Sequence, residues 1–345
     1  MLVVRAINAN DLDALYGLAS QVGTGMTTLK PDMKMLGDRL AIACASFAET
    51  IPPEKRDYMF VMEDTDTGRL AGVCAIKGAV GLEEPFYNYR IGTLVHSSRE
   101  LDVFTRMETL YLSNDLTGST ELCSLFLHPD WRRDGNGSLL SKSRFLFLAE
   151  FPEYFSPRVI AEMRGVSDEH GRSPFWESLG RHFFSMEFSE ADYLTGIGNK
   201  SFIAELMPQH LIYTAFLSAP ARAVIGQVHA NTRPALALLT GEGFRYNGYV
   251  DIFDAGPAVE CPLADIRAVR DSLCLLAADR PPPAHAQPWL VSNRRRHGFA
   301  VTLAHTAPDA DGQLPLDAQA LAALAIAPGD SVRAVPLSRP HPNRP

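Results

Sequence analysis

The hydrophobic pattern of the first half of the chain alternates between strand-like and helix-like periods. Residues 2–8 alternate as a strand does, and Asn10 precedes a helical pattern over residues 11–21 that it can cap. The other predicted elements are helices at 32–49 and 138–150, a hairpin of strands at 58–63 and 69–77, and strands at 89–97, 109–112, 121–128 and 158–163. This order predicts an α/β (α+β) fold, a mixed sheet with helices on both faces.

Two later segments, residues 173–184 and 231–244, are similar to each other. In each, a short helical pattern ends at a glycine, Gly180 or Gly243, and an aromatic residue then begins a strand. The similarity leaves two organisations open. The chain has either two duplicated halves or one domain with an insertion near 165–220.

The composition changes after Leu275, where proline and alanine become frequent. We expect a linker over residues 278–288, followed by a small, mostly β appendage with a helix at 317–324. We expect three parts. The first is residues 1–255, in which a second half, if present, would begin near 190. The second is residues 256–288, with a helix and the proline-rich linker, and the third is residues 289–337, with the β-rich appendage.

A glycine-rich turn between a strand and a helix is the strongest chemical signal in the chain. It reads Arg-Arg-Asp-Gly-Asn-Gly over residues 132–137. Glycines let the backbone approach a ligand closely, and the first amides of a helix favour an anion because they have no internal acceptor. Arginine adds cationic donors that suit phosphate oxygens. The residues expected to hold a phosphate-containing cofactor are therefore Arg132, Arg133, Gly135, Asn136 and Gly137.

Other phosphate motifs fit this turn less well. A P-loop requires Gly-Lys-Ser/Thr, whereas Gly137 is followed by Ser138 and Leu139. A dinucleotide fingerprint requires a third glycine and a later acidic residue. The turn taken alone also fits an ordinary strand-to-helix connection with solvated arginines.

Composition and charge narrow the class of protein. The 345 residues are 46% hydrophobic, which suffices for a sizeable core, and the net charge of −8 argues against nucleic acid as a partner. The negative charge suits a cationic substrate weakly. The five cysteines are far apart, and neither a signal peptide nor an apolar run of membrane-spanning length is evident. We therefore expect a cytoplasmic protein with reduced thiols and no membrane contact.

The pattern R-x-x-G-x-G in this setting resembles the pyrophosphate loop of GNAT-type N-acyltransferases, which bind an acyl-coenzyme A. Over nearly the full length, the chain also resembles the arginine N-succinyltransferase family, least clearly after residue 278. The segments that carry this resemblance are MLVVRAINANDLDAL, VGTGMTTL, FLHPDWRRDGNGSLLSKSRFLF, MRGVSDEHGRSPFWESLGRHFF and IGQVHANTRPALALLTGEGF. The resemblance implies a GNAT-like sheet in residues 1–255.

The resemblance also implies a reaction, in which succinyl-coenzyme A and L-arginine give N2-succinyl-L-arginine and coenzyme A. Some members of the family accept ornithine, and some are one of two related subunits. We therefore expect succinyl-coenzyme A as a co-substrate, no tightly bound cofactor, no metal, and assembly as a homo-oligomer or with a related subunit.

Two residue roles follow from the resemblance. It implies that His229 handles the proton as a general acid or base, and that Leu125 contacts succinyl-coenzyme A. Leu127 alternates with Phe126 and so faces the same side as Leu125, which adds it to the expected cofactor-binding residues. The histidine is expected to close a strand-like run over residues 223–228, at the edge of the sheet.

Several alternatives stay open at this stage. Glu121 competes with His229 as the proton acceptor, although a solvated strand end explains it better. The loop at 23–29 either covers the acceptor or only connects two helices. The candidates for contact with an arginine substrate, none of them assigned, are Glu83, Glu84, Arg90, Asp168 and Glu169. The run Arg294 to Arg296 is a candidate for contact with the 3′-phosphate of coenzyme A, although a solvated turn explains it better. The alternative functions are another amine N-acetyltransferase and a non-catalytic, coenzyme A-binding partner subunit.

Overall fold

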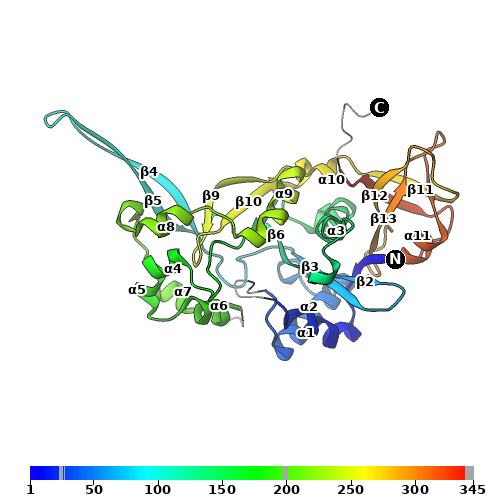
Figure 1. Ribbon diagram of the computed structural model, residues 1–345, viewed down its shortest axis with the longest axis horizontal. Coiled ribbons are helices and arrows are strands. Elements are labelled where there is room, and N and C mark those ends of the chain that lie inside the picture. Colours follow the sequence, from blue (N-terminus) through cyan, green and yellow to red (C-terminus); the bar gives the residue numbers. More distant parts are fainter. Residues whose placement is uncertain (23–25, 27, 197–200, 339–345) are drawn as a thin grey trace.

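The computed structural model describes residues 1–22, 26, 28–196 and 201–338. Fifteen strands within these residues form one mixed sheet, along which the molecule is elongated (Figure 1). The central strands, in spatial order, are β1 (Leu2–Ala6), β2 (Asp57–Asp64), β3 (Leu70–Lys77), β6 (Thr120–Leu127), β7 (Arg158–Glu162), β10 (Pro257–Pro262) and β9 (Arg245–Asp251).

Both edges of this central sheet are extended by further strands. Beyond β9 lie β4 (Asn88–Ser98), β5 (Val103–Ser113) and β8 (Ile212–Tyr213). Beyond β1 lie β13 (Ala300–Thr306), β12 (Gln287–Ser292), β15 (Ser331–Pro336), β11 (Leu273–Asp279) and β14 (Gln313–Leu316). The β4–β5 hairpin projects from one end of the molecule and the C-terminal strands form the other end (Figure 1).

The helices fall into two groups according to their place in the fold. Those that pack on the central sheet are α1 (Leu12–Ala19), α2 (Met33–Ala48), α3 (Asn136–Glu150) and α9 (Arg233–Glu242). The remaining ones are α4 (Pro174–Ser178), α5 (Gly180–Phe184), α6 (Phe188–Gly196), α7 (Ser201–Leu206), α8 (Ala219–Val224), α10 (Arg267–Arg270) and α11 (Ala318–Ala323). Helices α4 to α8 all belong to the segment between β7 and α9.

Helices cover both faces of the central sheet, as the sequence predicted. Successive side chains of a strand point to opposite faces. In β2, Met59 and Val61 join the hydrophobic cluster formed with α1 and α2. The alternate residues Tyr58 and Phe60 lie against Phe147 of α3, with ring centroids 4.9 and 5.2 Å away. Because β2 is buried on both faces, its sequence is almost continuously apolar.

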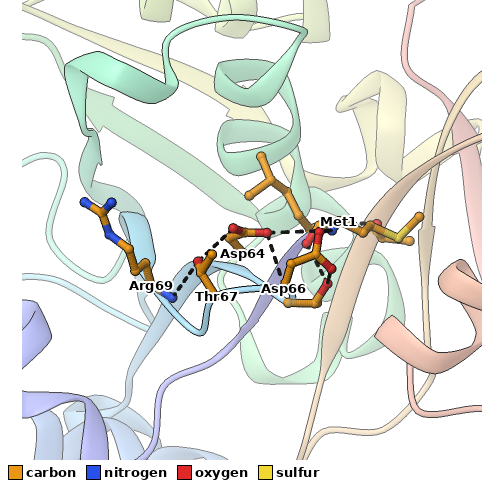
Figure 2. A network of polar contacts seen from close by, with 8 residues as sticks. Met1, Asp64, Asp66, Thr67 and Arg69 are labelled. Carbon is orange, nitrogen blue, oxygen red and sulfur yellow. Dashed lines mark hydrogen bonds and ion pairs between the residues drawn. The ribbon is translucent and has the colours of Figure 1, made fainter.

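The start of the chain is held against the β2–β3 turn, as Figure 2 shows. The Met1 ammonium lies 3.2 Å from Asp66 Oδ2 and 3.7 Å from Asp64 Oδ1. Thr67 Oγ1 donates to Asp64 Oδ2 at 2.7 Å and accepts from the Arg69 amide at 3.4 Å. These contacts fix β1 between β2 and β13, which joins the C-terminal strands to the central sheet.

Two predicted elements are wrong. The run at 223–228 is not a strand, because Ser218 caps α8, Pro220 lies in its first turn, and Gly226 then adopts a φ of 70°. Gly180 begins α5 instead of ending a helix before a strand. A Cβ at Gly180 would lie 2.2 Å from the Trp176 ring, so packing explains this glycine. The segment at 231–244 does behave as predicted, since α9 ends at Gly243 and β9 follows.

The segment predicted as a helix and a linker, residues 256–288, holds more regular structure than expected. It includes β10, which pairs with β7 and β9 inside the central sheet, as well as β11 and the short helix α10. Residues 280–286 are the stretch between β11 and β12. The boundaries of the three expected parts stay a prediction.

Candidate active site

Strands β6 and β7 separate soon after they begin, and a large cleft opens between them. The two strands are parallel but pair only at Thr120–Val159 and Glu121–Ile160. Farther along, β6 has a bulge, since its register against β3 shifts between Cys123 and Phe126, and Ser124 adopts a φ of 54°. The bulge turns β6 away from β7.

The cleft has a volume of about 1260 Å³ and joins residues that are far apart in the sequence. Its lining includes residues 121–127 of β6, 161–164 at the end of β7, loop residues 132–135, 137 and 138, and residues 230–232 before α9. The cleft therefore runs from the glycine-rich turn, through the gap between the strands, to the turn that holds His229.

The glycine-rich turn presents free amides to this cleft. Asp134 and Gly135 both adopt left-handed conformations, with φ of 51° and 79°, and this turns the chain into α3. Helix α3 has no side-chain cap, and the amides of Gly137 and Ser138 have no acceptor within the described part of the protein. Those donors, at the positive end of a helix, can bind an anion.

The glycine at position 137 is not required by the packing of the protein. A Cβ there would meet only Leu127 Cδ2, at 4.0 Å, and the backbone φ is not positive. A side chain would instead occupy space in the cleft. The small residue therefore leaves room for a ligand.

The predicted cofactor-binding residues line the cleft with one exception. Arg132 and Arg133 are exposed at its entrance, and Arg132 Nε donates to the Leu127 carbonyl at 3.0 Å. Asn136 is buried and turned inward, where its Nδ2 donates to the Trp131 carbonyl at 3.0 Å. Asn136 thus shapes the turn, and its side chain does not line the cleft.

Leu125 and Leu127 lie on the β6 side of the gap, and both line the cleft. Leu125 belongs to the bulge, outside the regular pairing with β3. A strand edge that lacks a neighbour can pair with an extended ligand as it would with another strand. The pantetheine arm of coenzyme A is a ligand of that shape.

His229 is held at the border of the cleft by two backbone contacts. Its amide donates to the Arg164 carbonyl at 2.9 Å, just beyond β7, and its Nδ1 accepts from the Asn231 amide at 3.2 Å. The ring itself is not part of the cleft lining, whereas Ala230 and Asn231 are. Partial burial, followed by the positive charge of Arg164, lowers the pKa of His229 below its usual 6.5.

Because Nδ1 accepts a hydrogen bond, the neutral His229 ring carries its proton on Nε2. A neutral ring of this tautomer is a hydrogen-bond donor from Nε2. To accept a proton on Nδ1, the ring must first lose its contact with Asn231. In the resting state the neutral ring therefore donates a hydrogen bond from Nε2, and it can gain a proton only at Nδ1.

Glu121 is not a solvated strand end, contrary to the sequence interpretation. It is 5% exposed, lines the cleft, and lies 3.8 Å from Lys77 Nζ. Its Oε2 has no hydrogen-bond partner within the described residues. The sequence alone does not reveal the burial of Glu121, because it is the pairing with β7 that covers this end of β6.

Sequence reasoning missed two carboxylates, Glu162 at the end of β7 and Asp251 at the end of β9, which line the cleft beside Glu121. Neither belongs to a spaced motif, and the position at the end of a strand was the only available signal. A second, smaller cavity lies beside this cleft. Neither space is lined by the sequence candidates for arginine binding, namely Glu83, Glu84, Arg90, Asp168 and Glu169.

Two further sequence interpretations concern the edges of the site. In the loop at 23–29, residues 23–25 and 27 lie outside the described residues, while Met26 and Thr28 line the cleft. The run at 294–296 does not line the cleft, and its contact with a phosphate stays a prediction. Arg294 pairs with Glu150 at 2.8 Å, Arg296 pairs with Glu49, and neither lines the cleft.

No group of three or more metal-ligating side chains with suitable geometry occurs in the described ranges. None of the helices described there is both long enough and apolar enough to span a bilayer. The five cysteines are free thiols.

Comparison with known proteins gives the family. The profile of the family described as arginine N-succinyltransferase beta subunit matches residues 2–268, and that of its C-terminal domain matches residues 273–336. The arginine N-succinyltransferase of Citrobacter koseri is 54% identical over 338 residues, 98% of each chain. The arginine N-succinyltransferase subunit beta of Pseudomonas aeruginosa is 55% identical over 337 residues, again 98% of each chain.

A solved structure agrees with this assignment. The arginine/ornithine succinyltransferase subunit AI from Pseudomonas aeruginosa superposes with a TM-score of 0.90 and 34% identity, covering 98% of this chain and 99% of that one. The mixed sheet with helices on both faces and a C-terminal β region confirms the predicted α/β fold class. The chain belongs to the arginine N-succinyltransferase family of acyltransferases.

Proposed function

We propose that this protein transfers the succinyl group of succinyl-coenzyme A to the α-amino group of L-arginine. The observation that carries the proposal is the single cleft that joins the uncapped start of α3 to the turn holding His229. A donor bound by its diphosphate at one end would extend its thioester toward the other end. Family membership supplies the identity of both substrates.

Donor binding begins at the glycine-rich turn. The diphosphate accepts hydrogen bonds from the amides of Gly137 and Ser138, and Arg132 and Arg133 add charge at the entrance. The pantetheine arm lies along the β6 bulge at Leu125 and Leu127, where it replaces the missing neighbour strand. Several weak contacts along the cleft thereby fix the thioester in one place.

The reaction is a direct attack within a ternary complex. The neutral amine nitrogen attacks the thioester carbonyl carbon, a C–N bond forms, and the C–S bond breaks. The amine loses one proton and the departing sulfur gains one. Positioning both substrates in one cleft contributes the larger part of the acceleration.

His229 passes the proton from the amine to the sulfur. Once Nδ1 is released from the Asn231 amide it accepts the amine proton, and the imidazolium so formed donates a proton to the sulfur as it leaves. The alternative acceptors of the amine proton are water and Glu121, a residue of the cleft wall whose Oε2 lacks a hydrogen-bond partner among the described residues. Acid–base help of this kind contributes about 100- to 10,000-fold.

The relatives named above suggest further properties of this chain. Two of them are named as subunits, and one is named for arginine and ornithine. We accordingly expect ornithine as a second acceptor, and assembly either with a second copy or with a related subunit.

A thiol-release assay with the purified protein tests the proposal, with mass spectrometry of the product. Succinyl-coenzyme A and L-arginine should release coenzyme A and give N2-succinyl-L-arginine, with acetyl-coenzyme A much slower. Equal rates with both donors would instead indicate a general amine N-acyltransferase. Donor binding without any turnover would indicate a partner subunit that depends on another chain.

A further inference from the structure

Three carboxylates form a wall between the main cleft and a second cavity. Glu121 near the start of β6, Glu162 at the end of β7 and Asp251 at the end of β9 line both spaces. The second cavity has a volume of about 250 Å³. Three strands thus bring together three acidic side chains from distant parts of the sequence.

The protein supplies these carboxylates with neutral donors and little positive charge. Asn88 Nδ2 donates to Glu162 Oε1 at 2.7 Å. The amides of Phe253 and Asp254 donate to Asp251 Oδ1 at 2.7 and 2.9 Å. Within the described ranges, no cationic side chain lies within salt-bridge distance of Glu162 or Asp251.

Two of the nearby cations, Arg39 and Lys30, pair with other carboxylates. Arg39 Nε lies 2.7 Å from Asp57 Oδ2, and Lys30 pairs with Asp192. Lys77 is 3.8 Å from Glu121, and Glu121 Oε2 still lacks a hydrogen-bond partner among the described residues although this side chain is 5% exposed. Glu121 thus lines both cavities with a carboxylate whose hydrogen bonding is incomplete, which leaves part of its bonding capacity for a ligand.

Electrostatics at the wall agree with that reading. Burial, followed by the negative charges of Asp251 and Glu121, raises the pKa of Glu162 well above its usual value. Carboxylates so close together, and so poorly solvated, are costly when all are ionised. A cation between them would remove this cost.

We propose that this wall binds the basic side chain of the acceptor, with Glu162 and Asp251 as the residues that pair with its cation. The inference rests on the proposed function and deepens it, since it concerns how the same cleft selects its amino acid. A guanidinium has five donors in a planar fork, which suits two neighbouring carboxylates. Asn88 acts as a positioning residue, because its amide fixes one oxygen of Glu162 and leaves the other for the ligand.

The placement also fits the reaction. The acceptor must hold its α-amino group near the thioester while its side chain lies elsewhere. A wall shared with a second cavity lets the side chain point away from β6 and the donor. An acyl group with its own carboxylate is repelled by the same wall, so succinyl and acceptor side chain are kept apart.

The test compares L-arginine with L-citrulline, which has the same shape but a neutral ureido group. Glu162→Gln and Asp251→Asn keep the size of each side chain and remove its charge. Each should raise the KM for L-arginine by about 10- to 100-fold, the range for hydrogen bonds to charged groups. The KM for L-citrulline should change little, so the preference for arginine should collapse.

Two controls make the result specific. Glu83→Gln removes a surface carboxylate that pairs with Lys55 at 2.6 Å and lines neither cavity, and should behave as the wild type. Coenzyme A affinity, measured by calorimetry, should be unchanged in all three variants. The melting temperature of Glu162→Gln should be equal to or above that of the wild type, because an unbalanced buried charge is removed.

The outcomes separate this inference from the proposed function. If the wild type transfers succinyl to arginine and both variants keep its preference for arginine over citrulline, the subsite is wrong and the function stands. If the wild type alone does not turn over, calorimetric binding of each amino acid to the coenzyme A-loaded protein replaces kinetics. Equal binding of arginine and citrulline by the wild type would then overturn the subsite.

Discussion

Two histidine turns in this protein share one local structure but face different surroundings. His128 and His229 each precede a short 3₁₀ turn, and each Nδ1 accepts from the amide two residues later at 3.2 Å. Both turns lead into a helix beside the cleft, α3 or α9. Of the two histidines, only His229 donates its backbone amide to the Arg164 carbonyl, just beyond the end of β7. The local motif orients each ring, and the surroundings are the reason that we propose a chemical role for His229 alone.

The largest expected effect on activity comes from removing the His229 ring. His229→Ala should lower kcat by about 100-fold or more and leave donor affinity nearly unchanged, because the lost group acts only on the reacting atoms. Steady-state kinetics with succinyl-coenzyme A and L-arginine measures this.

His128→Ala is the matched control, since it removes the same type of cap from the other turn. It should keep kcat within a few-fold of the wild type. If both variants lost kcat equally, the turns would matter only for folding. A near-normal kcat in His229→Ala would move the proton transfer to Glu121 or water.

The next effect concerns the loop that follows the first histidine. Gly137→Ala should weaken coenzyme A binding by about 10-fold, because the new methyl group occupies the approach of the diphosphate to the amides. Stability should be equal or slightly higher, since nothing in the protein is closer to this Cβ than 4.0 Å and alanine favours a helix. Calorimetry and thermal melting together measure both parts.

The double variant Gly135→Val plus Gly137→Val should weaken coenzyme A binding further. Gly135 has a φ of 79°, so valine there also strains the turn and should lower stability. Unchanged coenzyme A affinity in both variants would contradict a diphosphate site at this turn.

The smallest expected effect concerns the pKa of His229, which depends on the surroundings that distinguish it from His128. Burial and Arg164 lower the pKa of His229, so its neutral form persists at pH values below 6.5. Arg164→Met removes the positive charge, and the pKa of His229 should then rise toward 6.5. NMR titration of the ring protons measures the shift directly. An unchanged pKa in the variant would mean that burial alone sets it.

Sequence predicted the parts of the site that lie close together along the chain. The strand, glycine turn and helix at 121–150 were found because their signals are local, namely a period, two glycines and a helix start. The structure agrees on β6 and α3 within a few residues. Asn136 was predicted as a ligand because a sequence pattern does not say which way a side chain turns.

The rest of the site depends on how distant strands pair, which one sequence does not reveal. Glu121, Glu162 and Asp251 meet because β7 lies between β6 and β10, and β9 follows β10. The run at 223–228 was ambiguous, because short stretches of alanine and valine suit helix and strand alike. Ser218 and Pro220, which start α8, were the signals that would have decided it.

The most direct measurement is a crystal structure of the protein with coenzyme A and L-arginine bound. The account predicts diphosphate oxygens about 2.7–3.2 Å from the amide nitrogens of Gly137 and Ser138. The pantetheine arm should run beside Leu125, and the thiol should end near His229. A diphosphate bound elsewhere, with these two amides facing only solvent or protein atoms, would contradict the account.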